Sequence, residues 1–257
     1  MQYERLRFSI EDGIARIVLA NPARLNAVDG LFTREFADVA RRCEGTEGLR
    51  AVVLTAEGSA FSVGGDLREF LANRDHVSTH VREMTVYFHA AILTLNRLAA
   101  PVIVGVNGVA AGGGFSLVCM SDLAIAARSA KFNFAYTKSG LTPDGGATYF
   151  LPRMVGSQRA FELMALNPTL SAEDAQALGI VARVVDDEAL PVAVEEAVQR
   201  IAAAPAGANG RLKLQLRASA VNSLEQQFEL EGRGIAQGAG HPETLAALDA
   251  FFQRSGG

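Results

Sequence analysis

The chain has 257 residues, of which 49% are hydrophobic and 20% are charged, with a formal net charge of −4. This composition excludes a disordered protein and provides enough apolar side chains for one large globular core. The acidic balance, without a run of like charges, argues against a nucleic-acid partner. The two cysteines, Cys43 and Cys119, form no CxxC pair, so we predict neither a disulfide framework nor a zinc site. No segment has the pattern of a signal peptide or a membrane span, so we expect a cytoplasmic protein without a membrane partner.

Strands and helices alternate in the first half of the chain. Two apolar runs, residues 6–10 and 14–19, flank Glu11-Asp12-Gly13 and predict a β-hairpin. A helix capped by Asp29 leads to an apolar strand at residues 51–55. The order then repeats, with a helix at 81–97, strands at 102–106 and 123–127, and a short helix through Leu117 between them. Continuous apolar strands of this kind indicate an α/β fold, with a parallel sheet covered by helices on both faces.

The second half of the chain is predicted to be almost wholly helical from Ser157 onward. Five segments carry apolar residues at helical spacing behind Ser, Pro or Gly boundaries, and they begin near Ser171, Leu190, Gly210, Ser223 and Pro242. We interpret their periodic Leu, Val and Phe residues as core or subunit interface rather than as ligand contacts.

Two glycine-rich turns follow predicted strands and precede helices. Residues 60–67 follow the strand at 51–55, and residues 107–114 follow the strand at 102–106. Ligands of open α/β sheets bind beyond the carboxyl ends of the strands, and the exposed amides of such turns favour negative charge. Two facing turns could therefore form an oxyanion hole. The phosphate-loop and dinucleotide-binding patterns are both missing, which leaves a carbonyl substrate as the better fit.

A third segment, residues 139–147, places Asp144 in a turn rich in proline and glycine. On spacing alone this carboxylate is either the cap of the following helix or a functional group.

Together these segments resemble the crotonase superfamily, also called the enoyl-CoA hydratase/isomerase family. The resemblance covers nearly the whole chain, and it is carried by four motifs in order: 21–27 (NPARLNA), 61–67 (FSVGGDL), 107–114 (NGVAAGGG) and 140–146 (GLTPDGG). It implies a crotonase-like ββα spiral, which we expect in residues 1–200, and a C-terminal helical trimerisation region in residues 201–257. It also implies a homotrimer or hexamer.

The resemblance further implies that the substrate is a coenzyme A thioester, with no permanently bound cofactor and no metal. The amides that match the family's oxyanion hole are those of Gly65 and Gly113. The segments that hold the adenine and phosphates match seven residues: Ala23, Arg24, Leu25, Val63, Gly65, Asp66 and Leu67. Helix side chains such as those of residues 81–88 or Phe70 are expected to set the acyl-chain length.

The residue at each catalytic position of the family indicates the reaction. Family hydratases carry two glutamates at the positions of Ser116 and Tyr136, and neither of these side chains can act as a base at neutral pH. Asp144 stands where family isomerases carry Asp or Glu. With the thioester oxygen held, Asp144 would remove the C2 proton of a 3-enoyl-CoA and return it at C4, within fatty-acid or aromatic breakdown.

Three alternatives remain beside the isomerase. One is an enoyl-CoA hydratase. Another is an aryl-CoA dehalogenase, in which Asp144 is the nucleophile, His89 is the general base and Tyr136 replaces an orienting tryptophan. The last is a non-enzymatic acyl-CoA-binding or moonlighting member. We assign Ser116, Tyr136 and His89 to the substrate pocket.

Overall fold

The computed structural model describes residues 2–255. Met1, at the start of the expected spiral (residues 1–200), and residues 256–257, at the end of the expected helical region (residues 201–257), lie outside the described residues. The chain opens with the predicted hairpin, in which β1 (Leu6–Glu11) pairs antiparallel with β2 (Ile14–Leu19). Asp12 and Gly13 form its turn with positive φ angles of 51° and 73°, a conformation that Gly and Asp tolerate better than most residues.

The hairpin continues into a six-stranded sheet in the order β1-β2-β3-β5-β7-β10. Its other strands are β3 (Ala51–Ala56), β5 (Val102–Val106), β7 (Leu123–Ala127) and β10 (Arg183–Val185), and all of their pairings are parallel. The predicted parallel sheet is therefore confirmed. The prediction of an almost wholly helical second half is also confirmed. The three residues of β10 are too few to produce a recognisable strand pattern.

A second, smaller sheet carries the glycine-rich turns. Its order is β4-β6-β8-β9, with bounds β4 (Ala60–Ser62), β6 (Val109–Ala111), β8 (Lys131–Asn133) and β9 (Leu170–Ser171). β4 follows β3, β6 follows β5 and β8 follows β7, so each repeat adds one strand to each sheet. A helix follows the second strand of the first two repeats, which gives the ββα spiral.

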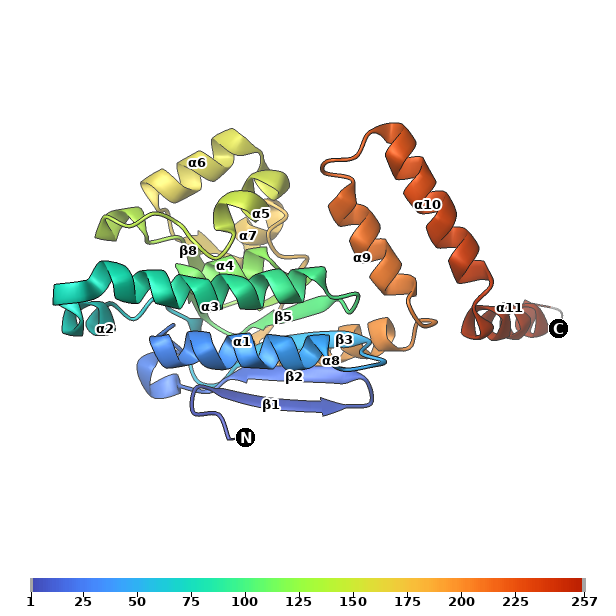
Figure 1. Ribbon diagram of the computed structural model, residues 1–257, viewed down its shortest axis with the longest axis horizontal. Helices are drawn as coiled ribbons and strands as arrows, with labels where there is room; N and C mark the ends of the chain where they lie inside the picture. The colour runs from blue at the N-terminus through green and yellow to red at the C-terminus, as the bar shows by residue number, and fades with distance from the viewer. Residues whose placement is uncertain (1, 256–257) are drawn as a thin grey trace.

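Helices cover both faces of the large sheet (Figure 1). On one face α1 (Gly30–Glu44) lies beside α3 (Val77–Arg97), and Phe36 and Phe88 are buried with them in the main core. The Asp29 side chain caps α1 by accepting from the Phe32 amide at 2.7 Å, as predicted. On the other face, α8 (Leu190–Ala202) buries Val194 against the sheet.

The remaining helices flank the turns or extend beyond the core. The helices near the turns are α2 (Leu67–Ala72), α4 (Gly113–Cys119), α5 (Ala147–Val155), α6 (Ser157–Leu166) and α7 (Ala172–Ala177). Four short 3₁₀ helices cover Pro22–Arg24, Arg74–His76, Thr137–Ser139 and Asp187–Ala189. No helix in residues 2–255 is long and apolar enough to cross a membrane.

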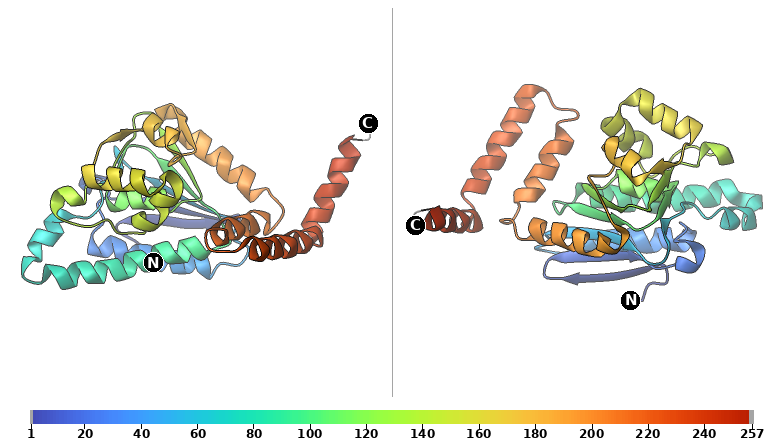
Figure 2. Two further views of the ribbon diagram at one scale, coloured as in Figure 1. Left: turned by 90° about the horizontal axis from the view of Figure 1, so that it is seen from above. Right: turned by 180° about the vertical axis from the view of Figure 1, so that it is seen from behind.

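The C-terminal helices α9 (Ala208–Ala218), α10 (Leu224–Ala239) and α11 (Pro242–Ser255) begin within two residues of the predicted positions. Helix α9 is joined to the body by Lys213, which is buried, and α10 and α11 extend away from the body of the fold (Figures 1 and 2). Several of their apolar side chains, including Phe228 and Ile235, are exposed in the single chain. The interpretation of these residues as core is therefore wrong for this part of the chain, and the interpretation as subunit interface stays a prediction.

Candidate active site

The two glycine-rich turns meet through their backbones. Gly64 has a φ of +81°, and a Cβ added to it would lie 2.7 Å from the Ala111 carbonyl oxygen and 2.9 Å from the Gly113 nitrogen. Because such distances exclude any side chain, only glycine allows the turns to approach this closely. The predicted juxtaposition of the two turns is therefore present.

The amides of Gly65 and Gly113 are placed to face a ligand. Val28 forms a bridge to Gly65 in which the Val28 N–H donates to Gly64 O and the Asp66 N–H donates to Val28 O. Since the flanking residues make both bonds, the Gly65 amide lies on the opposite side from Val28. Gly113 is the first residue of α4, where an amide has no partner within the helix. Both glycines line one cavity.

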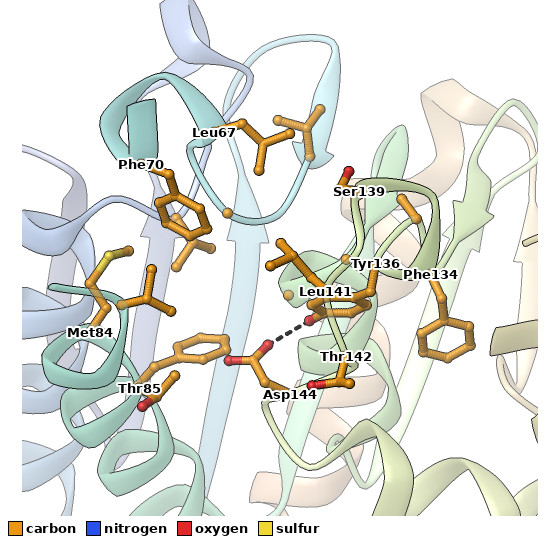
Figure 3. Close-up of a pocket in the computed structure, with 18 of the residues that line it drawn as sticks. Leu67, Phe70, Met84, Thr85, Phe134, Tyr136, Ser139, Leu141, Thr142 and Asp144 are labelled. Carbon is orange, nitrogen blue, oxygen red and sulfur yellow. Dashed lines mark hydrogen bonds between the residues drawn. The ribbon is translucent and has the colours of Figure 1, made fainter. Parts of the chain in front are cut away.

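This cavity has a volume of about 260 Å³ and is mainly apolar. Its apolar walls come from helices α2 and α3 and from loop segments, and consist of Val28, Val63, Leu67, Phe70, Val81, Met84, Phe88, Phe134 and Leu141. In Figure 3, Phe70 and Met84 lie across the cavity from Tyr136 and Leu141, with Asp144 between the two walls. Sequence reasoning pointed to Phe70 and the 81–88 helix. It missed Phe134, Ser139 and Thr142, whose segment has no periodic pattern that identifies a lining face.

Asp144 is fixed by several hydrogen bonds. The Tyr136 hydroxyl donates to Asp144 Oδ1 at 2.6 Å (Figure 3). The Ser116 hydroxyl donates to the Asp144 carbonyl oxygen at 2.8 Å and lies 3.2 Å from the Tyr136 oxygen. Helix α5 begins after Gly146 without a side-chain cap, so the alternative that Asp144 caps this helix is wrong. Its carboxylate is available for chemistry.

Tyr136 remains a hydrogen-bond donor under ordinary conditions. Burial raises its pKa above the usual value of 10.0, and the negative charge of Asp144 raises it further. Ala135, the preceding residue, has a φ of 57°, an uncommon conformation for a residue with a side chain. This residue immediately precedes the tyrosine whose phenol contacts Asp144.

His89 contacts Asp144 from the other side. It comes from α3, and its Nε2 atom lies 3.3 Å from Asp144 Oδ2 and 3.2 Å from the Gly145 amide nitrogen, which donates to it. His89 and Tyr136, which are far apart in the sequence, therefore contact the two oxygens of one carboxylate, and Ser116 holds the backbone carbonyl of the same residue.

The residues predicted to contact coenzyme A divide into two groups. Val63, Gly65 and Leu67 line the cavity, whereas Ala23, Arg24 and Leu25 do not. The second group lies at the adjacent turn, where the Val63 amide donates to Leu25 O at 3.2 Å. Arg24 forms an ion pair with Asp66, and Asp66 also caps α2 by accepting from the Arg68 and Glu69 amides. Asp66 thus has a structural role that its sequence position did not indicate.

Within residues 2–255, no group of three or more His, Cys, Asp or Glu side chains is arranged to hold a metal ion. The thiols of Cys43 and Cys119 are both buried and unpaired, and burial raises each pKa from 9.0 to about 12. Neither cysteine suits nucleophilic chemistry.

Comparison with known proteins gives consistent matches over nearly the full length. The family model described as enoyl-CoA hydratase/isomerase matches residues 9–254. The 4-chlorobenzoyl coenzyme A dehalogenase-1 of Arthrobacter sp. is 33% identical over 241 residues, covering 93% of this chain and 87% of the relative. The 1,2-epoxyphenylacetyl-CoA isomerase of Escherichia coli is 34% identical over 223 residues, covering 86% of this chain and 85% of the relative.

The fold is also found among solved structures. The crystal structure of an enoyl-CoA hydratase from Mycobacterium smegmatis matches with a TM-score of 0.88 at 31% identity, covering 98% of this chain and 97% of that chain. Similar proteins thus carry the names of a dehalogenase, an isomerase and a hydratase.

Proposed function

This chain belongs to the enoyl-CoA hydratase/isomerase family of acyl-CoA enzymes, and within that family we propose that it is an isomerase that moves a C=C bond from C3 to C2 of an enoyl-CoA. Asp144 is the acid/base in this proposal, and the amides of Gly65 and Gly113 hold the thioester oxygen.

The reaction needs one carboxylate and two amides. Asp144 takes the C2 proton, and the C–H electron pair moves into a dienolate whose negative oxygen accepts from the Gly65 and Gly113 N–H groups. Asp144 then returns a proton to C4, and the electron pair of the enolate closes the new C2=C3 bond. Tyr136 holds Oδ1 of the carboxylate, which leaves Oδ2 as the proton acceptor in this proposal.

The observation that carries the proposal is the composition of the cavity lining. Asp144 is the sole carboxylate among the described residues that line the cavity. The positions of the two hydratase glutamates hold Ser116 and Tyr136, and both side chains hydrogen-bond to Asp144. Tyr136 therefore supports the Asp144 carboxylate and Ser116 holds the backbone carbonyl of the same residue, so neither position supplies a carboxylate of its own, which favours isomerisation over hydration.

A dehalogenase is the second candidate, and the contact between His89 and Asp144 at 3.3 Å favours it. In that reaction the Asp144 carboxylate would attack the aryl carbon and displace halide, and His89 would activate the water that cleaves the aryl ester. The relative named as a 4-chlorobenzoyl coenzyme A dehalogenase has comparable identity to the one named as an isomerase.

Coenzyme A is expected at the mouth of the cavity, beside the turn of Ala23, Arg24 and Leu25 and above Val63 and Leu67.

The exposed apolar residues of the C-terminal helices, including Phe228 and Ile235, support assembly into a homotrimer or hexamer, which sedimentation would measure.

The purified protein should be given trans-3-hexenoyl-CoA, crotonyl-CoA and 4-chlorobenzoyl-CoA in turn, with products separated by mass. We expect the first to become its 2-enoyl isomer without a gain of water. Asp144→Asn should bind the substrate but lose turnover by about 100-fold or more, while the exposed control Asp75→Asn keeps it. Water addition to crotonyl-CoA as the main activity would refute the proposal, and chloride release would establish the dehalogenase.

A further inference from the structure

We propose that His89 relays protons between Asp144 and solvent, so that the proton taken from the substrate exchanges with water before it is returned at C4. This inference rests on the proposed isomerase function and concerns the fate of the proton. His89 acts through Asp144, so it is a positioning residue for the acid/base.

A proton on Asp144 has one side-chain neighbour that can receive it. Tyr136 holds Oδ1 as a donor at 2.6 Å, and a protonated phenol does not take up a further proton at ordinary pH. His89 Nε2 lies 3.3 Å from the other oxygen, Oδ2. Imidazole both accepts and releases protons near neutral pH, so this contact provides a route.

The surroundings of His89 Nε2 suit both of its protonation states. When Nε2 carries a lone pair, it accepts the Gly145 N–H at 3.2 Å. When Nε2 carries a proton, it can donate to Asp144 Oδ2 at 3.3 Å. Nε2 therefore has one donor and one acceptor within hydrogen-bond distance.

His89 also connects Asp144 to a different side of the protein. It does not line the cavity of the glycine turns, but lines a second cavity of about 450 Å³ together with Ile92, Asn96 and Tyr149. The His89 side chain is 45% exposed. The Asp144 side chain is itself 30% exposed. In this proposal the bound acyl group covers Asp144 from the first cavity, and the more exposed His89 then connects the carboxylate with solvent.

The relay moves one proton in each step and conserves atoms and charge. The C2–H bond breaks, an O–H bond forms on Asp144, and the electron pair stays with the dienolate. The Oδ2–H proton passes to Nε2, which leaves a carboxylate and an imidazolium. In D₂O an imidazolium N–H exchanges to N–D with release of HDO, and the deuteron returns through Asp144 to C4.

The test measures how much deuterium from the solvent enters the product. Trans-3-hexenoyl-CoA is converted in D₂O, the reaction is stopped at low conversion, and deuterium at C4 of the 2-enoyl product is measured by mass spectrometry. In wild type we expect deuterium in most product molecules. In His89→Gln, which keeps an acceptor for the Gly145 amide but has no group that takes up and releases a proton near neutral pH, the ratio of retained to exchanged hydrogen should rise about tenfold.

The matched control is His80→Gln on the same helix, where His80 Nε2 contacts Glu69 at 3.1 Å; it should exchange like wild type. His89→Asn serves as a second variant if the glutamine variant does not fold. The relay is refuted if wild-type product retains the substrate hydrogen, or if both His89 variants exchange as fully as wild type. Absence of any 2-enoyl product would instead refute the isomerase function, and the relay with it.

Discussion

A buried cation joins the C-terminal helices to the core, and its removal should destabilise the protein measurably. Lys213 of α9 is only 4% exposed. Its ammonium group donates to the carbonyl oxygens of Leu95 and Ala100, each at 3.0 Å, and pairs with Asp122 at 2.9 Å. Those carbonyls lie at the end of α3 and just before β5, so Lys213 links α9 to the elements that support the site.

The loss of stability expected for Lys213→Met follows from these hydrogen-bond and ion-pair partners. The variant leaves two carbonyl oxygens without this donor but also removes the cost of burying an ammonium group. Asp122 keeps two partners, Arg217 at 2.7 Å and the Val102 amide at 2.8 Å. The loss should therefore be about 2–3 kcal/mol, below the 3–5 kcal/mol of a buried ion left unpaired.

The difference in stability between wild type and Lys213→Met should depend on pH in one definite direction. Burial lowers the pKa of Lys213 below its ordinary 10.5, against the opposing charge of Asp122. Between the lowered pKa and the unfolded value, the unfolded chain binds more protons than the folded chain, so stability rises with pH in that window. The deficit of Lys213→Met relative to wild type should therefore grow as the pH rises through this window.

The assay is urea unfolding followed by circular dichroism at one fixed protein concentration, with exposed Lys138→Met as the control. The expected loss in the free energy of unfolding of Lys213→Met corresponds to a fall in Tm of roughly 5–10 °C. Asp122→Ala should cost more, about 3–5 kcal/mol, because it leaves the Lys213 charge buried without its counter-ion. A Lys213→Met variant within about 0.5 kcal/mol of wild type, or one less stable than Asp122→Ala, would refute this reasoning.

Three further predictions concern the site and the core. Tyr136→Phe should lower kcat by about tenfold with little change in KM, because Asp144 loses the 2.6 Å donor that orients it; an unchanged kcat in steady-state kinetics would contradict this role. Gly145→Ala should cost about 2–3 kcal/mol in urea unfolding and most of the activity, since Gly145 has a φ of +61° and a Cβ there would lie 2.8 Å from a phenyl carbon of Phe88; an active variant of wild-type stability would contradict it. The thiols of Cys43 and Cys119, with pKa values raised to about 12, should resist alkylation in the folded protein at pH 9 and react after unfolding. Because folding raises these pKa values, the thiols stabilise the folded protein below pH 9, and this contribution is lost between about pH 9 and 12. Rapid labelling of the native protein, measured by mass spectrometry, would show that burial does not protect them.

Local patterns in the sequence determined the elements of this fold. Alternation and an Asp-Gly turn specified the hairpin, Asp29 specified the start of α1, and Ser223 specified the start of α10 through a capping box. These features could be predicted because a turn, a cap or a periodic face depends on residues that are close in the chain. The glycine-rich turns likewise predicted where backbone amides could face a ligand, since their lack of side chains is visible in the sequence, while the choice of Gly65 and Gly113 came from the resemblance to the family.

The arrangement around Asp144 was decided only by the tertiary structure. No local pattern distinguishes a carboxylate that caps a helix from one held by a distant phenol and imidazole, and the structure assigned Asp144 to the second kind. The small sheet and β10 were also missed, because strands of two or three residues are stabilised by pairing with distant neighbours rather than by their own sequence. The sequence by itself thus determined which segments form helices, strands and close turns. Packing between distant segments decided which side chains share the site, because hydrogen bonds and burial depend on positions that only the folded chain defines.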